Sequence, residues 1–284
     1  MNQNCRPVSE SPFAQVHWPD HHPVGLVLDG VAIPELGKQI YQWAGDQPFD
    51  AECLYVTTRW EAVSDLSPWL VWLSGPEDPV LQGFLAQGGE QEQGYLVISA
   101  TDRATCARWM RSHLQVETAP GCEELVRIAH PALARTVIGD NLPRFSIRAV
   151  ERLIVPDRVS GQWHLVEPAA VQPGSSGDQT GKMRTSPDLK RAFEAFNRRK
   201  DALQIWNNLD ESVRHQLGGP DLRNAYPALG RILEEALGSG CNSQREVMQF
   251  LFATLPRQAD SNAVMERVPP IESRMNNDTD TTPH

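Results

Sequence analysis

A segment rich in Pro, Gly, Ser and Thr divides this chain into two parts with different hydrophobic patterns. Residues 168–187 read PAAVQPGSSGDQTGKMRTSP, a composition typical of a linker. Before this segment, short apolar runs alternate with helical patterns, whereas after it only helical periodicity occurs. The chain is therefore predicted to form two lobes around separate cores, which fits its length of 284 residues.

The part before the linker is predicted to be an α/β (α+β) lobe with a mixed sheet, spanning residues 23–167. Helical patterns begin after Pro34, Val80, Thr101 and Pro131, between the apolar runs. Residues 1–22 are polar and contain three prolines, so we expect a flexible arm there. The runs that predict strands are 24–30, 53–57, 68–73, 94–99 and 125–128, followed by a hairpin of 147–155 with 163–166.

The part after the linker is predicted to be a small all-helical lobe spanning residues 188–255. Apolar side chains recur at three- and four-residue spacing in three stripes, and Ser243 followed by Glu246 is a capping pattern for the last helix. The polar residues 256–284 are predicted to be a disordered tail.

Charge is distributed unevenly between the two parts. The net charge is -10, and residues 1–174 carry 12 Lys and Arg against 21 Asp and Glu, whereas residues 175–284 carry 14 against 15. An acidic chain is a poor general nucleic-acid binder, so no nucleic-acid partner is expected. No targeting segment and no apolar stretch long enough for a bilayer is visible, which predicts a cytoplasmic protein without a membrane partner.

Known catalytic and cofactor motifs are missing from the sequence, so we expect no catalytic residues, no cofactor and no metal. The five cysteines are widely spaced, which favours reduced thiols over a disulfide framework. Two alternatives rest on the residue inventory alone. His17, Asp20, His21 and His22 offer metal ligands in a loop. A thiol nucleophile would pair Cys106 or Cys122 with His113 or His130.

A basic run marks the first helix predicted after the linker. Its members alternate with Phe193 and Phe196, and such a run is either a solvated face or a contact face for a partner. The candidate contact residues are Lys190, Arg191, Arg198, Arg199 and Lys200.

The order of motifs over residues 24–140 resembles that of the adaptor or chaperone family of bacterial type VI secretion. The motifs are VGLVLDG at 24–30, SPWLVWL at 67–73, WMRSHL at 109–114 and LVRIAHP at 125–131. The residues that carry the resemblance, and are therefore candidate partner-binding or signature positions, are Asp29, Pro68, Trp69, Arg111, Arg127, His130 and Pro131. Their alternative role is structural, with Trp69 in the core and Arg127 paired internally.

Two positions depart from the family pattern. Arg111 stands before Ser-His-Leu instead of after His-Leu, and His130 stands where the family usually has Asp before proline. An Asp at a helix start complements the helix dipole and a neutral His does not, so if the family Asp caps the following helix or pairs with Arg127, we expect His130 to do neither in the same way.

The resemblance implies a cytoplasmic, non-enzymatic adaptor that binds a secreted toxic effector and loads it onto the VgrG spike, whose C-terminal extension would be the second partner. The alternatives are an immunity protein, favoured by the acidic charge of residues 1–174, and an unrecognised cysteine-dependent enzyme.

Overall fold

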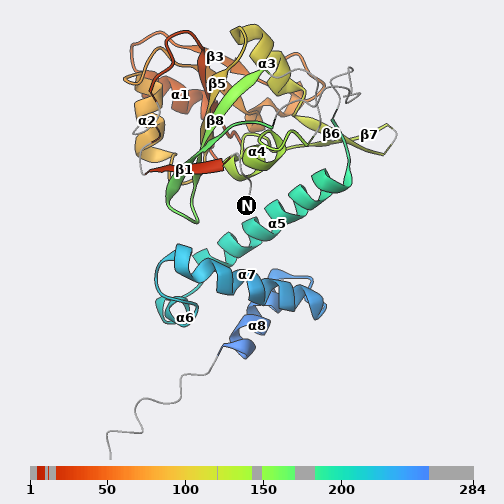
Figure 1. Cartoon of the computed structure of the whole chain (residues 1–284). Helices are drawn as coiled ribbons and strands as arrows, with labels where there is room; N and C mark the ends of the chain where they lie inside the picture. Colours follow the sequence, from red (N-terminus) through yellow and green to blue (C-terminus); the bar gives the residue numbers. More distant parts are fainter. Residues whose placement is uncertain are drawn as a thin grey trace, which may run out of the picture.

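The computed structural model describes residues 5–9, 12, 17–119, 121–142, 149–169 and 183–255, which form an α+β lobe followed by a helical lobe (Figure 1). This confirms the predicted fold class. The α+β lobe contains β1 (Cys5–Ser9), β2 (Val24–Leu28), α1 (Leu36–Ala44), β3 (Asp50–Cys53), the 3-10 helix η1 (Glu61–Leu66), β4 (Trp69–Trp72), α2 (Pro79–Gln87), β5 (Gly94–Ser99), α3 (Arg103–Arg111), β6 (Gln115–Ala119), β7 (Cys122–Leu125), α4 (Pro131–Val137), β8 (Val150–Asp157), β9 (Gln162–Val166) and β10 (Met183–Arg184).

A seven-stranded sheet in the order β1-β9-β8-β5-β2-β4-β3 forms the centre of this lobe. Every pairing described in it is antiparallel, for example Leu26 with Leu96 and with Val71. The mixed pairing predicted for the main sheet occurs instead in a small sheet, where β10 runs parallel to β6 and β6 pairs antiparallel with β7.

Alternating side chains of the main sheet enter two separate cores. Leu26 and Leu28 pack with α1 and α2 on one face, whereas Val27 packs with α3, α4 and the small sheet on the other. This follows from the two-residue period of a strand. Because both faces are covered, the central strands are almost entirely buried and read as continuous apolar runs, as their sequences indicate.

The helical lobe consists of α5 (Pro187–Asn207), α6 (Glu211–Gln216), α7 (Leu222–Gly238) and α8 (Gln244–Thr254). Helix α5 belongs to both lobes. Its first half packs Leu189 and Phe196 on the α+β core, and its second half packs Ile205 and Trp206 on α7 and α8. Figure 1 shows α5 running from one lobe to the other. The predicted capping box at Ser243 and Glu246 is present at the start of α8.

Three segments differ from their predicted conformation. Residues 5–9 of the expected flexible arm form β1, because the outer edge of β9 offers unpaired backbone groups to pair with. Part of the expected linker, Met183–Arg184, forms β10. Of the strand expected at 125–128, only Leu125 lies in a strand. The observed strand is β7, which pairs with β6 in a hairpin that turns at Gly121, whose φ is 76°. The expected tail 256–284 lies outside the described residues.

Gly30 allows a close approach between the end of β2 and the residues before β4. A Cβ placed on Gly30 would lie 2.2 Å from the carbonyl oxygen of Ser67. We expect Gly30→Ala to lower the free energy of unfolding by about 1–3 kcal/mol, because backbone must move to relieve this contact. Urea denaturation of both chains measures the effect.

Gly75→Ala is the matched control, because a Cβ there meets nothing within 4 Å and the change should stay within about 0.5 kcal/mol. Equal stability of the two variants would contradict the packing described for Gly30.

Candidate functional site

A groove on the α+β lobe lies between the start of α1 and the residues around η1. We call it the Trp69 groove; it has a volume of 650 Å³. Leu36, Gly37 and Trp69 line its apolar part, and Val56 and Asp65 are among the residues of its rim. The ring of Trp69 lies against Gly37, where a Cβ would approach it to 3.4 Å. Trp69 is half-buried, so the expected core role holds for only part of its side chain.

An ion pair forms at Asp29, directly after the end of β2. Arg127 Nε donates to Asp29 Oδ2 at 2.8 Å, and Asp29 Oδ1 also accepts from the Val31 amide at 3.0 Å. Burial raises the pKa of Asp29, although Arg127 and the backbone hydrogen bonds stabilise its carboxylate. The expected internal pairing of Arg127 is therefore confirmed, and its partner comes from a strand end 98 residues away.

His130 caps helix α4 with a ring nitrogen, in a way that differs from the carboxylate cap of an Asp. Its Nδ1 accepts from the Ala132 amide at 3.2 Å, and Pro131 occupies the first turn of the helix. Burial, together with the charges of Arg127 and Arg199, lowers the pKa of His130 to about 3. The ring is therefore neutral at pH 7, and a neutral imidazole nitrogen can accept the capping hydrogen bond.

Two further signature positions, Pro68 and Arg111, make internal contacts. Pro68 is buried, and its carbonyl oxygen accepts from the Leu54 amide at 2.9 Å. Arg111, at the end of α3, donates to Glu52 on β3 at 3.1 Å. The structure thus brings Asp29, Pro68, Arg127 and His130 to one end of the sheet, with Arg111 on a separate contact.

A buried guanidinium joins the two lobes. Arg199 of α5 donates from Nη1 and Nη2 to the two carboxylate oxygens of Glu92, at 2.8 and 2.5 Å, and from Nη2 to Asp157 at 2.8 Å. Glu92 is 3% exposed and Arg199 9%. Burial opposes the charge of Arg199, but the two carboxylates outweigh it and raise its pKa above the ordinary value. Bidentate pairing of this kind fixes orientation as well as distance.

Asp157, at the end of β8, extends this cluster. Its Oδ2 lies 3.4 Å from both Arg135 Nη1 and His164 Nε2, and it accepts from Ser160 at 3.1 Å. Burial opposes the charge of Asp157, but the hydrogen bond from His164 and the two arginines hold its pKa well below the usual range. The hydrogen bond to Asp157 is the main cause that raises the pKa of His164 to about 9.

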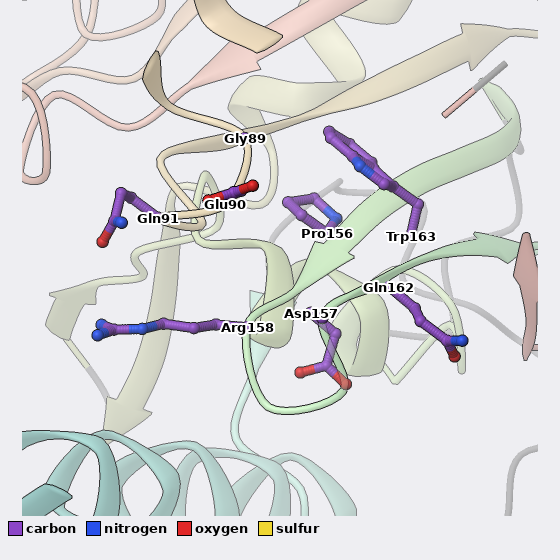
Figure 2. A pocket seen from close by; sticks show the side chains of 9 residues that line it. Gly89, Glu90, Gln91, Pro156, Asp157, Arg158, Gln162 and Trp163 are labelled. Atoms are coloured by element: carbon purple, nitrogen blue, oxygen red, sulfur yellow. The ribbon is translucent and has the colours of Figure 1, made fainter. Parts of the chain in front are cut away.

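The carboxylates of this junction were not found in the sequence because nothing local marks them. Glu92 lies in a turn with a φ of 55°, and Asp157 ends a strand. Figure 2 shows Gly89–Gln91, which directly precede Glu92 in the same turn, and the hairpin at Pro156–Trp163, which contains Asp157, around a cavity of 520 Å³. Arg158 extends from the hairpin, and its Nη2 donates to Asn207 at the end of α5 at 2.8 Å.

The basic run on α5 does not form one surface. Lys190, Arg191, Arg198 and Lys200 are exposed, but Arg199 is buried at the junction, so its assignment to a contact face is wrong. The reason is helical geometry, because Arg199 lies three residues after Phe196 and four before Leu203, on the apolar stripe of α5.

A second groove lies in the helical lobe between α5, α7 and α8 and has a volume of 190 Å³. Its apolar lining comes from Ile205, Leu233, Leu237 and Val247, and Leu237 is 47% exposed. Each lobe therefore presents an apolar depression of its own.

The cysteines and histidines considered for thiol catalysis are placed unfavourably for it. Burial raises the pKa of Cys106 to about 11 and lowers that of His113 to about 4. At neutral pH such a thiol is protonated and a poor nucleophile. Cys122 is exposed on β7, in the hairpin with β6.

His22, one of the histidines considered as metal ligands, lies against β5 and β8. His22 Nδ1 lies 3.0 Å from the Ser99 carbonyl oxygen and 3.5 Å from Glu151. Among the described residues, no three His, Cys, Asp or Glu side chains gather in an arrangement for a metal ion. Of the helices described, none has the length and apolar character needed to cross a membrane.

Residues 26–140 match the family model described as domain of unknown function (DUF4123). The match covers less than half of the chain and includes all seven signature positions named from the sequence. This family is associated with effectors of type VI secretion. No curated protein and no solved structure matches the chain.

Removing the Arg199 guanidinium should weaken the junction strongly. We expect Arg199→Ala to lower the free energy of unfolding by about 3–5 kcal/mol, because it leaves the buried carboxylate of Glu92 without its bidentate cation and removes one of the cations beside Asp157. Arg198→Ala, which removes the exposed neighbour, should change stability by no more than about 0.5 kcal/mol. Guanidinium denaturation measures both, and similar values for the two variants would show that the junction contributes little.

The pairing of His164 with Asp157 makes stability depend on pH. The folded-state pKa of about 9 exceeds the ordinary 6.5, so the stabilisation is complete below about pH 6.5 and is lost as the pH rises through 9. We expect a loss on the order of 1–2 kcal/mol between pH 6.5 and 9.5, reduced by solvent screening of the partly exposed ring.

Urea denaturation of the natural chain and of His164→Gln across this pH range measures the contribution of His164. The thiols and tyrosines that also ionise in this range are common to both chains, so their effect cancels in the comparison. The natural chain should lose stability more steeply with pH. Parallel curves would contradict the assignment.

Proposed function

We propose that this chain is a non-catalytic adaptor of a bacterial type VI secretion system, which binds a toxic effector in the cytoplasm and loads it onto the VgrG spike. The observation that carries the proposal is the match of residues 26–140 to a family associated with such effectors. The resemblance of the sequence motifs adds the adaptor role.

The two-lobe architecture supports a protein that joins two partners. The Trp69 groove lies on the α+β lobe, and the second groove lies on the helical lobe between α5, α7 and α8. Exposed apolar depressions on a protein surface commonly mark sites of protein–protein contact. Because the Arg199 junction fixes α5 against the α+β lobe, partners bound at the two grooves would be held in a defined relation.

Catalysis by a thiol is not favoured by the chemistry of the described residues. Cys106 is buried with a raised pKa, and Asp157 and His164 form structural ion pairs at the junction. Replacing each cysteine by alanine should leave effector delivery intact, whereas loss of delivery with any one folded variant would favour the enzyme alternative.

Joint capture tests the proposal directly. The tagged chain is co-expressed with a type VI effector and with the C-terminal extension of a VgrG protein from the same genome. We expect both to co-purify with the chain, and we expect the effector not to co-purify with VgrG when the chain is omitted. Failure to capture either protein at micromolar concentration would contradict the adaptor role.

Protection from the toxin distinguishes the immunity alternative. A cell that produces the toxin in its cytoplasm should not be rescued by this chain alone. Full rescue, without any VgrG protein, would favour an immunity protein whose acidic lobe complements a basic toxin.

A further inference from the structure

Exposed apolar residues lie in and next to the segments that line the Trp69 groove: Val56 lines it, and Val63 and Leu66 adjoin its lining residues Ser64 and Asp65 on η1. Val31 is 50% exposed, Val56 41%, Val63 39% and Leu66 50%, and these are four of the eight large apolar residues found exposed among those described. The Gly30–Val31 turn belongs to this group, because a Cβ on Gly30 would lie 2.9 Å from the backbone of Leu66. Concentrated apolar exposure beside a concave surface is typical of a contact with another chain.

Carboxylates outnumber cations around the groove. Glu35 and Asp65 line it, and Glu61, four residues before Asp65 on η1, accepts from the Thr57 amide at 3.2 Å. Lys38 is the cation that lines the groove, and it is paired with Glu35 at 3.2 Å. Arg59 is directed to Glu123 on β7, at 2.6 Å. An occupant is therefore met by a local negative potential, which favours a cationic partner.

Asp65 carries the clearest unmatched charge at the rim. It is exposed, and no ion pair or hydrogen bond of its carboxylate is found in the described part of the chain. A Lys or Arg side chain from a partner can pair with it without displacing an existing contact. Because Val63 and Leu66 flank it on η1, charge and apolar surface occur together.

The backbone is unusual at Glu35, which lines the groove, and at Thr57, which follows the lining residue Val56. Glu35 and Thr57 have φ values of 50° and 65°, in the left-handed region that a β-branched residue such as Thr rarely adopts. Hydrogen bonds from the Thr57 amide to Glu61 and from Thr58 Oγ1 to the Tyr55 carbonyl oxygen, at 2.6 Å, secure this turn. Backbone of this kind clusters at binding sites, where it keeps a surface preformed and lowers the entropic cost of binding.

From these features we infer that the Trp69 groove binds a short segment of a protein partner in which apolar side chains are flanked by Lys or Arg. The inference rests on the proposed function, since it assigns to this groove the segment by which an effector is held. The apolar side chains of the segment lie over Trp69, Val56 and Leu66, and its cations pair with Asp65 and Glu61. The volume of 650 Å³ accommodates a few side chains and not a folded domain.

Synthetic peptides provide the probe. Three fluorescein-labelled peptides share one length: a Leu- and Val-rich core with Lys flanks, the same core with Glu flanks, and a Ser-substituted core with Lys flanks. Fluorescence anisotropy with the full-length chain should show binding of the first peptide, at least about tenfold weaker binding of the other two, and a loss of affinity with added salt. Equal binding of all three, or no binding of the first, would overturn the inference.

Two exposed substitutions locate the binding surface. Leu66→Ser should weaken the Lys-flanked peptide about tenfold. Asp65→Lys should weaken it too and strengthen the Glu-flanked peptide, because the sign of the rim charge is reversed. The matched controls lie on the helical lobe, where Phe252 is 52% exposed and Glu234 is an exposed carboxylate. Phe252→Ser and Glu234→Lys should leave both affinities unchanged, and equal losses in the controls would contradict the assigned site.

The same variants separate this inference from the proposed function. If the natural chain captures its effector and Leu66→Ser captures it equally well, the groove assignment fails and the adaptor role stands. If the peptide binds at the groove but no effector is captured, the adaptor role fails. A dimer of the chain that Leu66→Ser dissociates in light scattering would assign the groove to a second copy and overturn the inference.

Discussion

The buried guanidinium of Arg199 determines how the two parts of this molecule are joined. It spans from the middle of α5 to a turn and a strand end of the α+β lobe, through Glu92 and Asp157. Burying three charges is costly, and such a cluster often contributes little net stability compared with apolar packing. What it supplies is geometry, because the bidentate pairing of Arg199 with Glu92 forms only when α5 lies in one position. The apolar contacts of Leu189 and Phe196 then complete the interface.

This constraint holds the two grooves of the molecule in a fixed arrangement. The Trp69 groove is formed by α1 and the segment before β4, and the groove of the helical lobe is formed by α5, α7 and α8. Since α5 packs on both cores, the two lobes are joined by one continuous helix. An adaptor that presents an effector to a spike benefits from this arrangement, because a partner held in one orientation loses less entropy when the second partner binds.

The sequence predicted the central strands well because their burial on both faces leaves a direct record in composition. It also predicted the internal pairing of Arg127, although not that Asp29 is the partner. It failed where the outcome depended on distant residues. Residues 5–9 have the composition of a polar arm, and they form a strand only because they pair with the edge of β9. The basic run on α5 predicts one surface because the charge pattern alone does not show which of its side chains face the α+β lobe. Arg199 lies on the helical stripe that includes Phe196 and Leu203. The helical spacing therefore indicated burial of Arg199, although its charge favoured an exposed position. No such local signal marks Glu92.

Hydrogen exchange of the natural chain tests the claim that the Arg199 junction makes the two lobes one body. If α5 is fixed by Arg199, the amides of its first half should exchange as slowly as those of β8, to which the junction ties it. Protection should continue through Arg199 without a break toward Trp206. Fast exchange over the first half of α5, with β8 and α7 both protected, would show that the lobes move independently and would contradict the account.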